Sequence, residues 1–478
     1  MNKGIKSGKI FNNSIIFNLA VFILVSTLNL IFVLNHEIWG DEAQAWLIAR
    51  DFTPVSLFNI TSLEGHPFLW YYILMPFAKL NFPCITLNLV SYFIMELTLF
   101  IVLFYSPLDN VLKFVVSFSP MFIYTYSVIS RNYCLCALFT VLIALAYRSR
   151  NKKPVIYGIL LALLLQTHII MAGMTFIMCV VWLIETIKQR NDYEVNFKKN
   201  IFGMSIPFLS ALFLLYEFRN VASADASKQA PAIPHKHFVF AGICIVYVFS
   251  LLVLYRIIEN KSVYKLIVIT SFSVLFQLLI YLFVYSYSLD RLMTWAFILL
   301  FFVWNSYFCK TDGLHYKKLR IAYAVLILCL AAVLFKNIYV KSVKDIVYPY
   351  TDAKNAAEFI DKSIDTDDTV IINSDESCIA VVPYLRNATL YDPFAQKELT
   401  YISRNKNRTN KRWLDYEEFM KTSKSCCGNK NYVYMLLSPT STTGDPDKII
   451  SNSEVIYDST KDYIITEEAF ILVKYCFK

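Results

Sequence analysis

Asp41 and Glu42 are adjacent carboxylates placed where they could do chemistry. They lie in the segment NHEIWGDEAQAWLIARD, which follows a long apolar run. Acidic side chains beside a membrane are costly and usually serve a function, and an ionised carboxylate can accept a proton from a reacting hydroxyl. A short helix that begins at Asp41 would hold this carboxylate at the positive end of the helix. Trp39 and Trp46 would anchor the loop at the interface. The alternative is an N-capped interfacial helix with solvated charges.

A second polar group lies in the same loop, directly before a short apolar run. Glu64 and His66 occur in EGHPFLWYY, where Pro67 suits the first turn of a helix. An isolated His of this kind is more often structural than catalytic, but this one shares its loop with Asp41. We therefore take Glu64 and His66 as candidate substrate-binding residues.

Cations that could hold an anionic substrate are predicted on the same side of the membrane. Arg131 and Tyr133 lie in YSVISRNY, and the planar guanidinium of an Arg suits a phosphate. A lone Arg at this depth can also reach toward lipid headgroups. The other candidates on this side are His168, Lys228 and Arg291. Arg291 could instead pair with Asp290, and Lys228 belongs to a polar loop that could close over a substrate.

The composition indicates that membrane helices position these residues. Of 478 residues, 57% are hydrophobic and 17% are charged, with a mean hydropathy of +0.48. An ordinary soluble protein has about 25% charged residues. This composition excludes a disordered protein, a disulfide-stapled mini-protein and a typical cytosolic enzyme. No basic stripe with interleaved aromatic residues indicates nucleic-acid binding, and no Cys/His spacing indicates zinc.

The apolar runs predict a polytopic α-helical membrane protein. About 20 apolar residues span a bilayer, and we predict eleven spans at 14–34, 84–105, 113–128, 133–147, 155–170, 170–187, 201–217, 238–255, 264–286, 292–309 and 319–338. The run 66–80 is short and is expected to form an interfacial helix. With that assignment Lys and Arg collect in one set of loops, which places the N-terminus in the cytoplasm and the first large loop, 35–83, outside.

The polarity of the chain divides it into two predicted domains. Residues 1–340 form a multi-span membrane domain that carries the candidate site and the excess of Lys and Arg. Residues 341–478 form a more polar domain, expected outside the cytoplasm. Its pattern predicts a small α/β fold with helices at 353–360, 379–385 and 413–420 and strands at 369–373, 432–437, 453–457 and 470–475.

The motifs GDEAQAW, EGHPFLWYY and SRNY, with a cytoplasmic N-terminus, one span and a long outer loop, resemble a known family. The arrangement is similar to the GT-C glycosyltransferases that use polyprenyl-phosphate sugars, close to the family 39-like group of protein O-mannosyltransferases and aminoarabinose transferases. The resemblance is specific over the first ~135 residues and architectural afterwards. Members often have Pro-Pro after the His, whereas Phe68 follows Pro67 here.

The resemblance implies an inverting glycosyltransferase of the cell envelope. A sugar would pass from a polyprenyl-phosphate donor in the bilayer to a hydroxyl of a glycan, lipid or protein acceptor on the extracytoplasmic face. Asp41 would be the general base, and Glu42 would orient either Asp41 or the acceptor. Glu64 and His66 would line the acceptor side. Arg131 and Arg291 would face the leaving phosphate. The lipid-linked sugar donor would be the only co-substrate, with no obligatory cofactor; a divalent metal is left open, with none expected as obligatory.

Two other functions stay open on the sequence alone. The first is a transporter or flippase, for which Glu96, inside a predicted span, would be the ion-coupling residue. The second is a non-catalytic envelope scaffold whose tail binds glycans or proteins. The abundance of Asn, Lys, Ile and Tyr favours a bacterial origin, and hence an inner or plasma membrane.

Overall fold

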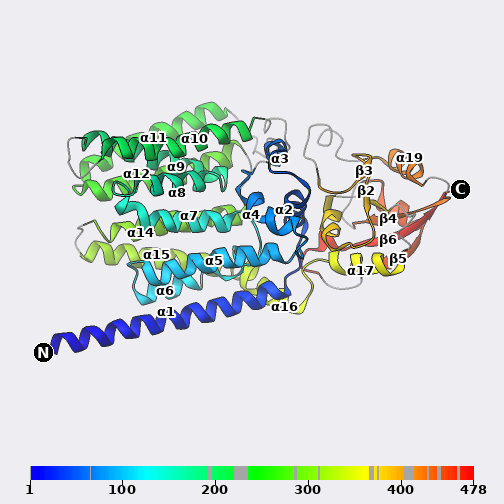
Figure 1. Ribbon diagram of the computed structural model, residues 1–478, viewed down its shortest axis with the longest axis horizontal. Coiled ribbons are helices and arrows are strands. Elements are labelled where there is room, and N and C mark those ends of the chain that lie inside the picture. The colour runs from blue at the N-terminus through cyan, green and yellow to red at the C-terminus, as the bar shows by residue number, and fades with distance from the viewer. Residues whose placement is uncertain are drawn as a thin grey trace.

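A computed structural model describes most of the chain. The described residues are 2–64, 66–190, 196–219, 235–284, 288–309, 313–364, 371–373, 376–402, 414–427, 430–438, 443–459 and 463–477. The molecule is elongated, with a helical bundle at one end and a β-sheet at the other (Figure 1). The N-terminus lies at the far end of the bundle and the C-terminus at the far end of the sheet.

Long apolar helices make up the bundle. They are α1 (Asn2–Asn35), α5 (Thr86–Tyr105), α6 (Asn110–Ser117), α7 (Tyr133–Ala146), α8 (Pro154–Leu165), α9 (Ala172–Lys188), α10 (Phe197–Glu217), α11 (Lys236–Ile257), α12 (Lys261–Phe283), α14 (Thr294–Ser306) and α15 (Gly313–Val333). Among the described residues, six helices are long and apolar enough to cross a membrane, or seven if the bent pair of α15 and the helix after it counts as one. The protein is therefore an integral membrane protein.

The count of eleven spans stays a prediction, because several of the predicted spans are short or broken helices. α7 and α8 are apolar but shorter than a full span. The run 113–128 contains the last part of α6, a break at Ser119 and Pro120, and a single π-helical turn, η1 (Met121–Thr125), in which Tyr124 has a φ of 76°.

Three short helices form the large loop after α1. They are α2 (Gly40–Asp51), α3 (Leu57–Glu64) and α4 (Leu69–Lys79). α2 is rich in Ala, Leu and other good helix formers, and it ends shortly before Pro54, which disfavours a helical conformation in the residue before it. The helix expected from Asp41 is thus present, and α4 corresponds to the short helix expected over 66–80. Trp46 is only 3% exposed and packs in the core, so its expected role as an interface anchor is wrong.

The C-terminal part contains a mixed six-stranded sheet in the order β3-β2-β1-β4-β6-β5. The strands are β1 (Ile371–Asn373), β2 (Leu390–Asp392), β3 (Lys397–Glu398), β4 (Tyr432–Leu437), β5 (Glu454–Asp458) and β6 (Ile471–Cys476). β1 is parallel to β2 and β4, and β6 lies antiparallel between β4 and β5. The flanking helices are α17 (Ala353–Ser363), α19 (Tyr416–Cys426) and α20 (Pro446–Ser451). The helix expected over 379–385 is instead two short 3₁₀ turns, η7 (Glu376–Ala380) and η8 (Val382–Tyr384), because Pro383 cannot donate a helical hydrogen bond.

α2 lies where the bundle meets the sheet, as Figure 1 shows. Leu47 on its buried face packs into the same apolar cluster as Ile379 and Leu390 of the C-terminal part. The Gln44 side chain donates to the carbonyl of Ile402 at 2.7 Å and accepts from the Ile402 N–H at 2.9 Å. Residues far apart in the sequence therefore fix the helix that begins with Asp41.

Candidate functional site

Asp41 and Arg131 form an ion pair at the start of α2. The guanidinium of Arg131 also lies 6.0 Å from the ring centre of Trp39 and 5.8 Å from that of Tyr133, which favours a cation–π arrangement. The Asp41 side chain is 33% exposed and that of Arg131 is 20% exposed. The site therefore combines a partly exposed carboxylate with a guanidinium, a group whose planar geometry suits a phosphate.

Tyr133, the first residue of α7, connects this pair to three other predicted residues. Its hydroxyl accepts a hydrogen bond from Nε of Arg291 at 3.3 Å. Its ring stacks on His168, with ring centres 5.4 Å apart, and the His168 ring lies 5.1 Å from that of His66. Asp41, Arg131 and these four residues form one connected group, which we call the outer cluster.

Five separate segments bring the outer cluster together. α2 supplies Asp41, the segment before α4 supplies His66, and the segment 131–133 supplies the Arg and Tyr. His168 caps the short turn η3 (Ile169–Met171), where its Nδ1 accepts the N–H of Ile170 at 3.2 Å. Arg291 lies in α13 (Leu289–Leu292).

Asp290 is a carboxylate beside this cluster. Burial raises its pKa, while Arg131, Lys341 and Arg291 oppose that rise, and Asp41 contributes a smaller increase. The carbonyl of Asp290 accepts the hydroxyl of Tyr126 at 2.5 Å. Asp290 therefore interacts with several cations of the site, and its neighbour Arg291 makes a contact with Tyr133.

Glu42 points away from the outer cluster into the protein core. Its carboxylate is fully buried and accepts hydrogen bonds from the N–H of Trp39 at 3.2 Å, from Asn88 at 3.1 Å and from the N–H of Ser130. A buried carboxylate with this many donors fixes the backbone around it. Glu42 thus holds the first turn of α2 and the segment before Arg131 in one position.

His36 continues this buried network and was missed as a functional candidate. Its Nε2 lies 3.1 Å from Glu42 and its Nδ1 lies 2.7 Å from Asp345 of α16 (Lys341–Val347). Burial alone would lower the pKa of His36, but the charges of Glu42 and Asp345 outweigh it and raise the pKa to about 10. Tyr350 packs on its ring, with centres 4.3 Å apart.

The signals for these two missed residues differ. His36 lies in the same segment as Asp41, six positions before Glu42. This proximity in sequence is a local signal that His36 could pair with a buried Glu42. Asp345 is separated from His36 by 309 positions and carries no local motif. Only the folded chain reveals it.

Glu64 and Lys228 are the remaining predicted site residues. Glu64 accepts a hydrogen bond from Gln44 at 3.1 Å, on the side of α2 that faces the C-terminal part. It therefore contacts Gln44, the residue that fixes α2 to the C-terminal part. Lys228 lies outside the described residues. In the described part of the chain, no group of three or more His, Cys, Asp or Glu side chains is arranged to hold a metal ion.

The comparisons with known proteins show the fold and nothing finer. No protein-family model matches the sequence, and no curated protein matches it. Among solved structures, the chain is similar to ArnT from Cupriavidus metallidurans, which was solved bound to undecaprenyl phosphate. The match has a TM-score of 0.51 and 10% sequence identity, and it covers 96% of this chain and 97% of ArnT. The chain therefore has a GT-C-like fold, similar to that of ArnT over nearly its whole length.

Proposed function

We propose that this protein is a membrane glycosyltransferase that moves a sugar from a polyprenyl-phosphate donor to an acceptor hydroxyl, with Asp41 as the general base. The observation that carries the proposal is the partly exposed Asp41–Arg131 pair within the outer cluster. The fold supports it, because the similar ArnT was solved with undecaprenyl phosphate, a lipid carrier of the required class.

The proposed reaction is a displacement at the anomeric carbon of the sugar. The acceptor oxygen attacks this carbon while its proton passes to a carboxylate oxygen of Asp41. The bond between the anomeric carbon and the phosphate oxygen breaks, its electron pair stays on the polyprenyl phosphate, and the configuration inverts. A base of this kind contributes about 10²–10⁴-fold to the rate.

Arg131 gives this mechanism a simple order of events. Before the donor binds, Arg131 is held by Asp41. A phosphate offers the guanidinium a bidentate partner, so the donor would draw Arg131 away and leave the carboxylate able to accept a proton. Arg291, held near Arg131 by Tyr133, would add a second cation where negative charge develops.

The other candidate residues have supporting roles in this proposal. Glu42 acts as a positioning residue, through His36 and the backbone of Trp39. His66 lines the acceptor side, and Glu64 supports α2 through Gln44. We expect no obligatory metal ion. The acceptor is a hydroxyl of a glycan, a lipid or a protein.

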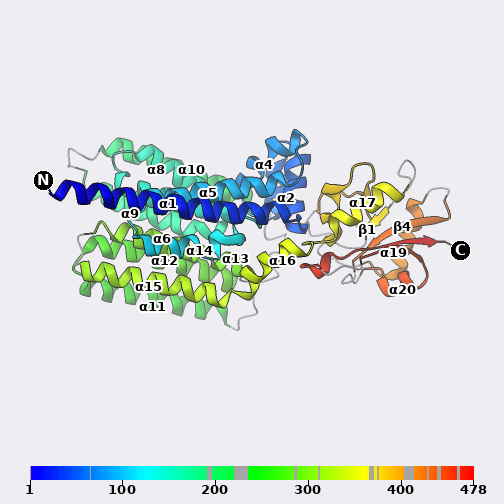
Figure 2. The same cartoon turned by 90° about the horizontal axis from the view of Figure 1, so that it is seen from below.

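The position of the site favours reaction at one membrane surface. The loop helix α2 and the sheet lie at the same end of the bundle, opposite the N-terminus (Figure 2). We propose that residues 1–340 form the catalytic domain, that residues 341–478 form an extracytoplasmic domain, and that the N-terminus lies in the cytoplasm of a bacterial cell.

Transfer is tested with the purified full chain in proteoliposomes, given undecaprenyl-phosphate hexoses and pentoses one at a time with a crude envelope extract as acceptor. We expect undecaprenyl phosphate to be released with one of these donors, together with a product heavier by one sugar. Asp41→Asn should reduce release by about 10²–10⁴-fold. The matched control is Asp51→Asn, which makes the same change at an exposed position of the same helix. Donor that crosses the bilayer chemically unchanged would favour the transporter instead.

Glu96 gives the transporter alternative its own control. Its carboxylate accepts hydrogen bonds from Ser26 and, at 3.3 Å, from Asn29 of α1, so the neighbouring helix satisfies it. We therefore expect Glu96→Gln to leave sugar transfer in place. Loss of sugar transfer in Glu96→Gln, with transfer retained in Asp41→Asn, would favour the transporter.

A further inference from the structure

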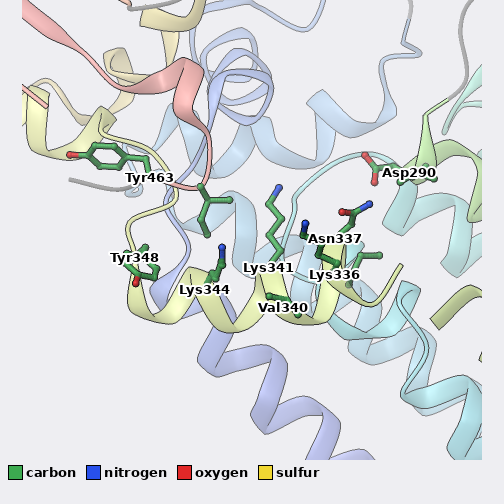
Figure 3. A pocket seen from close by; sticks show the side chains of 11 residues that line it. Asp290, Lys336, Asn337, Val340, Lys341, Lys344, Tyr348 and Tyr463 are labelled. Atoms are coloured by element: carbon green, nitrogen blue, oxygen red, sulfur yellow. The ribbon is translucent and has the colours of Figure 1, made fainter. Parts of the chain in front are cut away.

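A second cationic region lies where α16 meets the C-terminal part. A cavity of about 750 Å³ opens there between the turn η6 (Lys336–Val340), α16, α13 and the segment around Tyr463. Its polar lining residues are Asp290, Lys336, Asn337, Lys341, Lys344, Tyr348 and Tyr463. Lys341 and Lys344 extend from α16 in the same direction, toward the space between Asp290 and Tyr463 (Figure 3).

Three ammonium groups against one carboxylate make this cavity strongly cationic. Lys336 and Lys344 are exposed and form no ion pair with any residue that the structure describes. Lys341 donates to the hydroxyl of Tyr350 at 2.8 Å, which uses one of the three hydrogens of its ammonium group. The cavity therefore has charge and donors to spare for a small anion.

The segment that carries these lysines also presents an apolar surface. Phe335 is 59% exposed, Val343 is 56% exposed and Val347 is 67% exposed, all within or beside η6 and α16. α16 meets α15 at an angle of 54°. A bent amphipathic segment that presents apolar side chains on its surface and lysines along the cavity is suited to the interface between lipid and water. The anion that fits this cavity is therefore attached to a lipid.

We propose that this cavity binds the phosphate monoester of a polyprenyl carrier, and that it prefers the carrier after the sugar has left. The inference rests on the proposed transfer reaction. Before transfer the donor is a phosphodiester with one negative charge. When the bond to the sugar breaks, its electron pair stays on the phosphate, which becomes a monoester with a charge of about −1.5 to −2 at pH 7. A cavity with three cations stabilises the more highly charged form.

Asp290 connects the cavity to the outer cluster. It lines the cavity and interacts electrostatically with Lys341 on one side and with Arg131 and Asp41 on the other. A phosphate that leaves the neighbourhood of Asp41 thus passes from the two arginines of the outer cluster toward the three lysines. This arrangement draws the leaving group away from the reacting carbon.

The test measures binding of three probes to the full chain in detergent by native mass spectrometry. The probes are undecaprenyl phosphate, its methyl ester, which is a diester, and inorganic phosphate. The variants are Lys341→Met and the double variant Lys336→Met with Lys344→Met. The control is Lys198→Met with Lys199→Met, two exposed lysines that begin α10. The opposite end of α10 contacts the loop helices, where Glu217 accepts the N–H of Phe68 at 3.0 Å.

We expect the wild type to bind undecaprenyl phosphate more tightly than the methyl ester. The cavity variants should lose about tenfold or more of the affinity for the monoester, because each charge-assisted hydrogen bond is worth that much. Their affinity for the ester should change much less, and the control should match the wild type. Inhibition of sugar transfer by added undecaprenyl phosphate should also weaken in the double variant.

Three results would overturn this inference. In the first, the cavity variants lose the same affinity for the monoester and the diester. In the second, the control variant loses as much affinity as the cavity variants. In the third, inorganic phosphate binds as tightly as undecaprenyl phosphate. If Lys341→Met fails to fold, the double variant decides, since its two lysines are exposed. The test separates this inference from the proposed transfer reaction. If the double variant still transfers sugar and binds undecaprenyl phosphate as the wild type does, the cavity proposal is wrong and the transferase proposal stands. If the wild type binds the monoester selectively but transfers no sugar, the transferase proposal is wrong.

Discussion

At the scale of single residues, the site is defined by the partner that each charged side chain has. Asp41 pairs with Arg131 at the surface, whereas its neighbour Glu42 is buried with His36. Two adjacent carboxylates therefore have different environments and, in our proposal, different roles. The sequence motifs predicted most members of the outer cluster because Asp41, Arg131 and Tyr133 lie in short recognisable segments. The long-range partner Asp345 could not be predicted.

The role of Arg131 is tested by Arg131→Lys. A lysine keeps the positive charge but loses the planar, bidentate geometry that suits a phosphate. We expect kcat to fall by about 10²–10³-fold, as for other groups that stabilise developing charge. Steady-state transfer assays measure it, with Arg50→Lys on the same helix, whose partner is the exposed Asp51, as the control. Equal rates in Arg131→Lys and wild type would contradict the proposed phosphate contact.

His36 makes stability depend on pH in a specific way. Its pKa is about 10 in the folded protein, above the ordinary value of 6.5, because two carboxylates contact it. The contribution of protonated His36 to the free energy of unfolding is therefore complete below about pH 6.5 and is lost as the pH rises through 10. We expect the Tm of the wild type to fall between pH 7 and 10.5. His36→Gln should have a lower Tm at pH 7 and a flatter pH profile. Parallel profiles would show that His36 is not charged in the native protein.

At the scale of elements, α2 is held from both sides. Glu42 fixes it to the bundle, while Gln44 and Leu47 fix it to the C-terminal part. Glu468 adds a hydrogen bond at its start, where it accepts the Gly40 N–H at 2.8 Å. The helix itself was predictable from helix formers and a following Pro, since these are local signals. Its contacts with residues hundreds of positions away were not.

Glu468 gives this element a test of its own. Burial raises its pKa to about 8, against the effect of the Gly40 hydrogen bond, with Asp41 and Glu42 adding to the rise. Because this pKa lies above the ordinary value of 4.5, the folded protein holds a proton that the unfolded chain has lost between about pH 4.5 and 8, and the free energy of unfolding falls as the pH rises through this range. We expect Glu468→Gln, which cannot ionise, to resemble the wild type near pH 4.5 and to keep a higher Tm above pH 8. Thermal unfolding of both proteins across this pH range measures the difference. Parallel Tm profiles in the two proteins would rule out a role for Glu468.

At the scale of the whole molecule, the proposed site and the lysine-lined cavity lie at one end. α2, α13, α16 and the sheet gather at the end opposite the N-terminus (Figures 1 and 2). The broad architecture was predictable because apolar run length and polarity report membrane and tail regions directly. The number of spans was harder to establish, because breaks such as the one at Pro120 depend on packing.

The orientation is tested by adding a protease to intact spheroplasts. If the C-terminal part lies outside the cytoplasm, it should be cleaved within residues 341–478 while an N-terminal tag survives. Opening the membrane should expose the tag as a control. Removal of the tag in intact spheroplasts would reverse the orientation and move the outer cluster to the cytoplasmic face.

The most direct test of the central claim compares the envelope glycans and glycolipids of host cells that carry wild type, Asp41→Asn or Asp51→Asn at equal expression, by mass spectrometry. We predict that one sugar mass disappears from a defined carrier only in Asp41→Asn, because only that variant lacks the proposed base. Unchanged spectra in Asp41→Asn, from a host that requires the gene, would contradict a catalytic role for Asp41 and with it the proposed transferase mechanism.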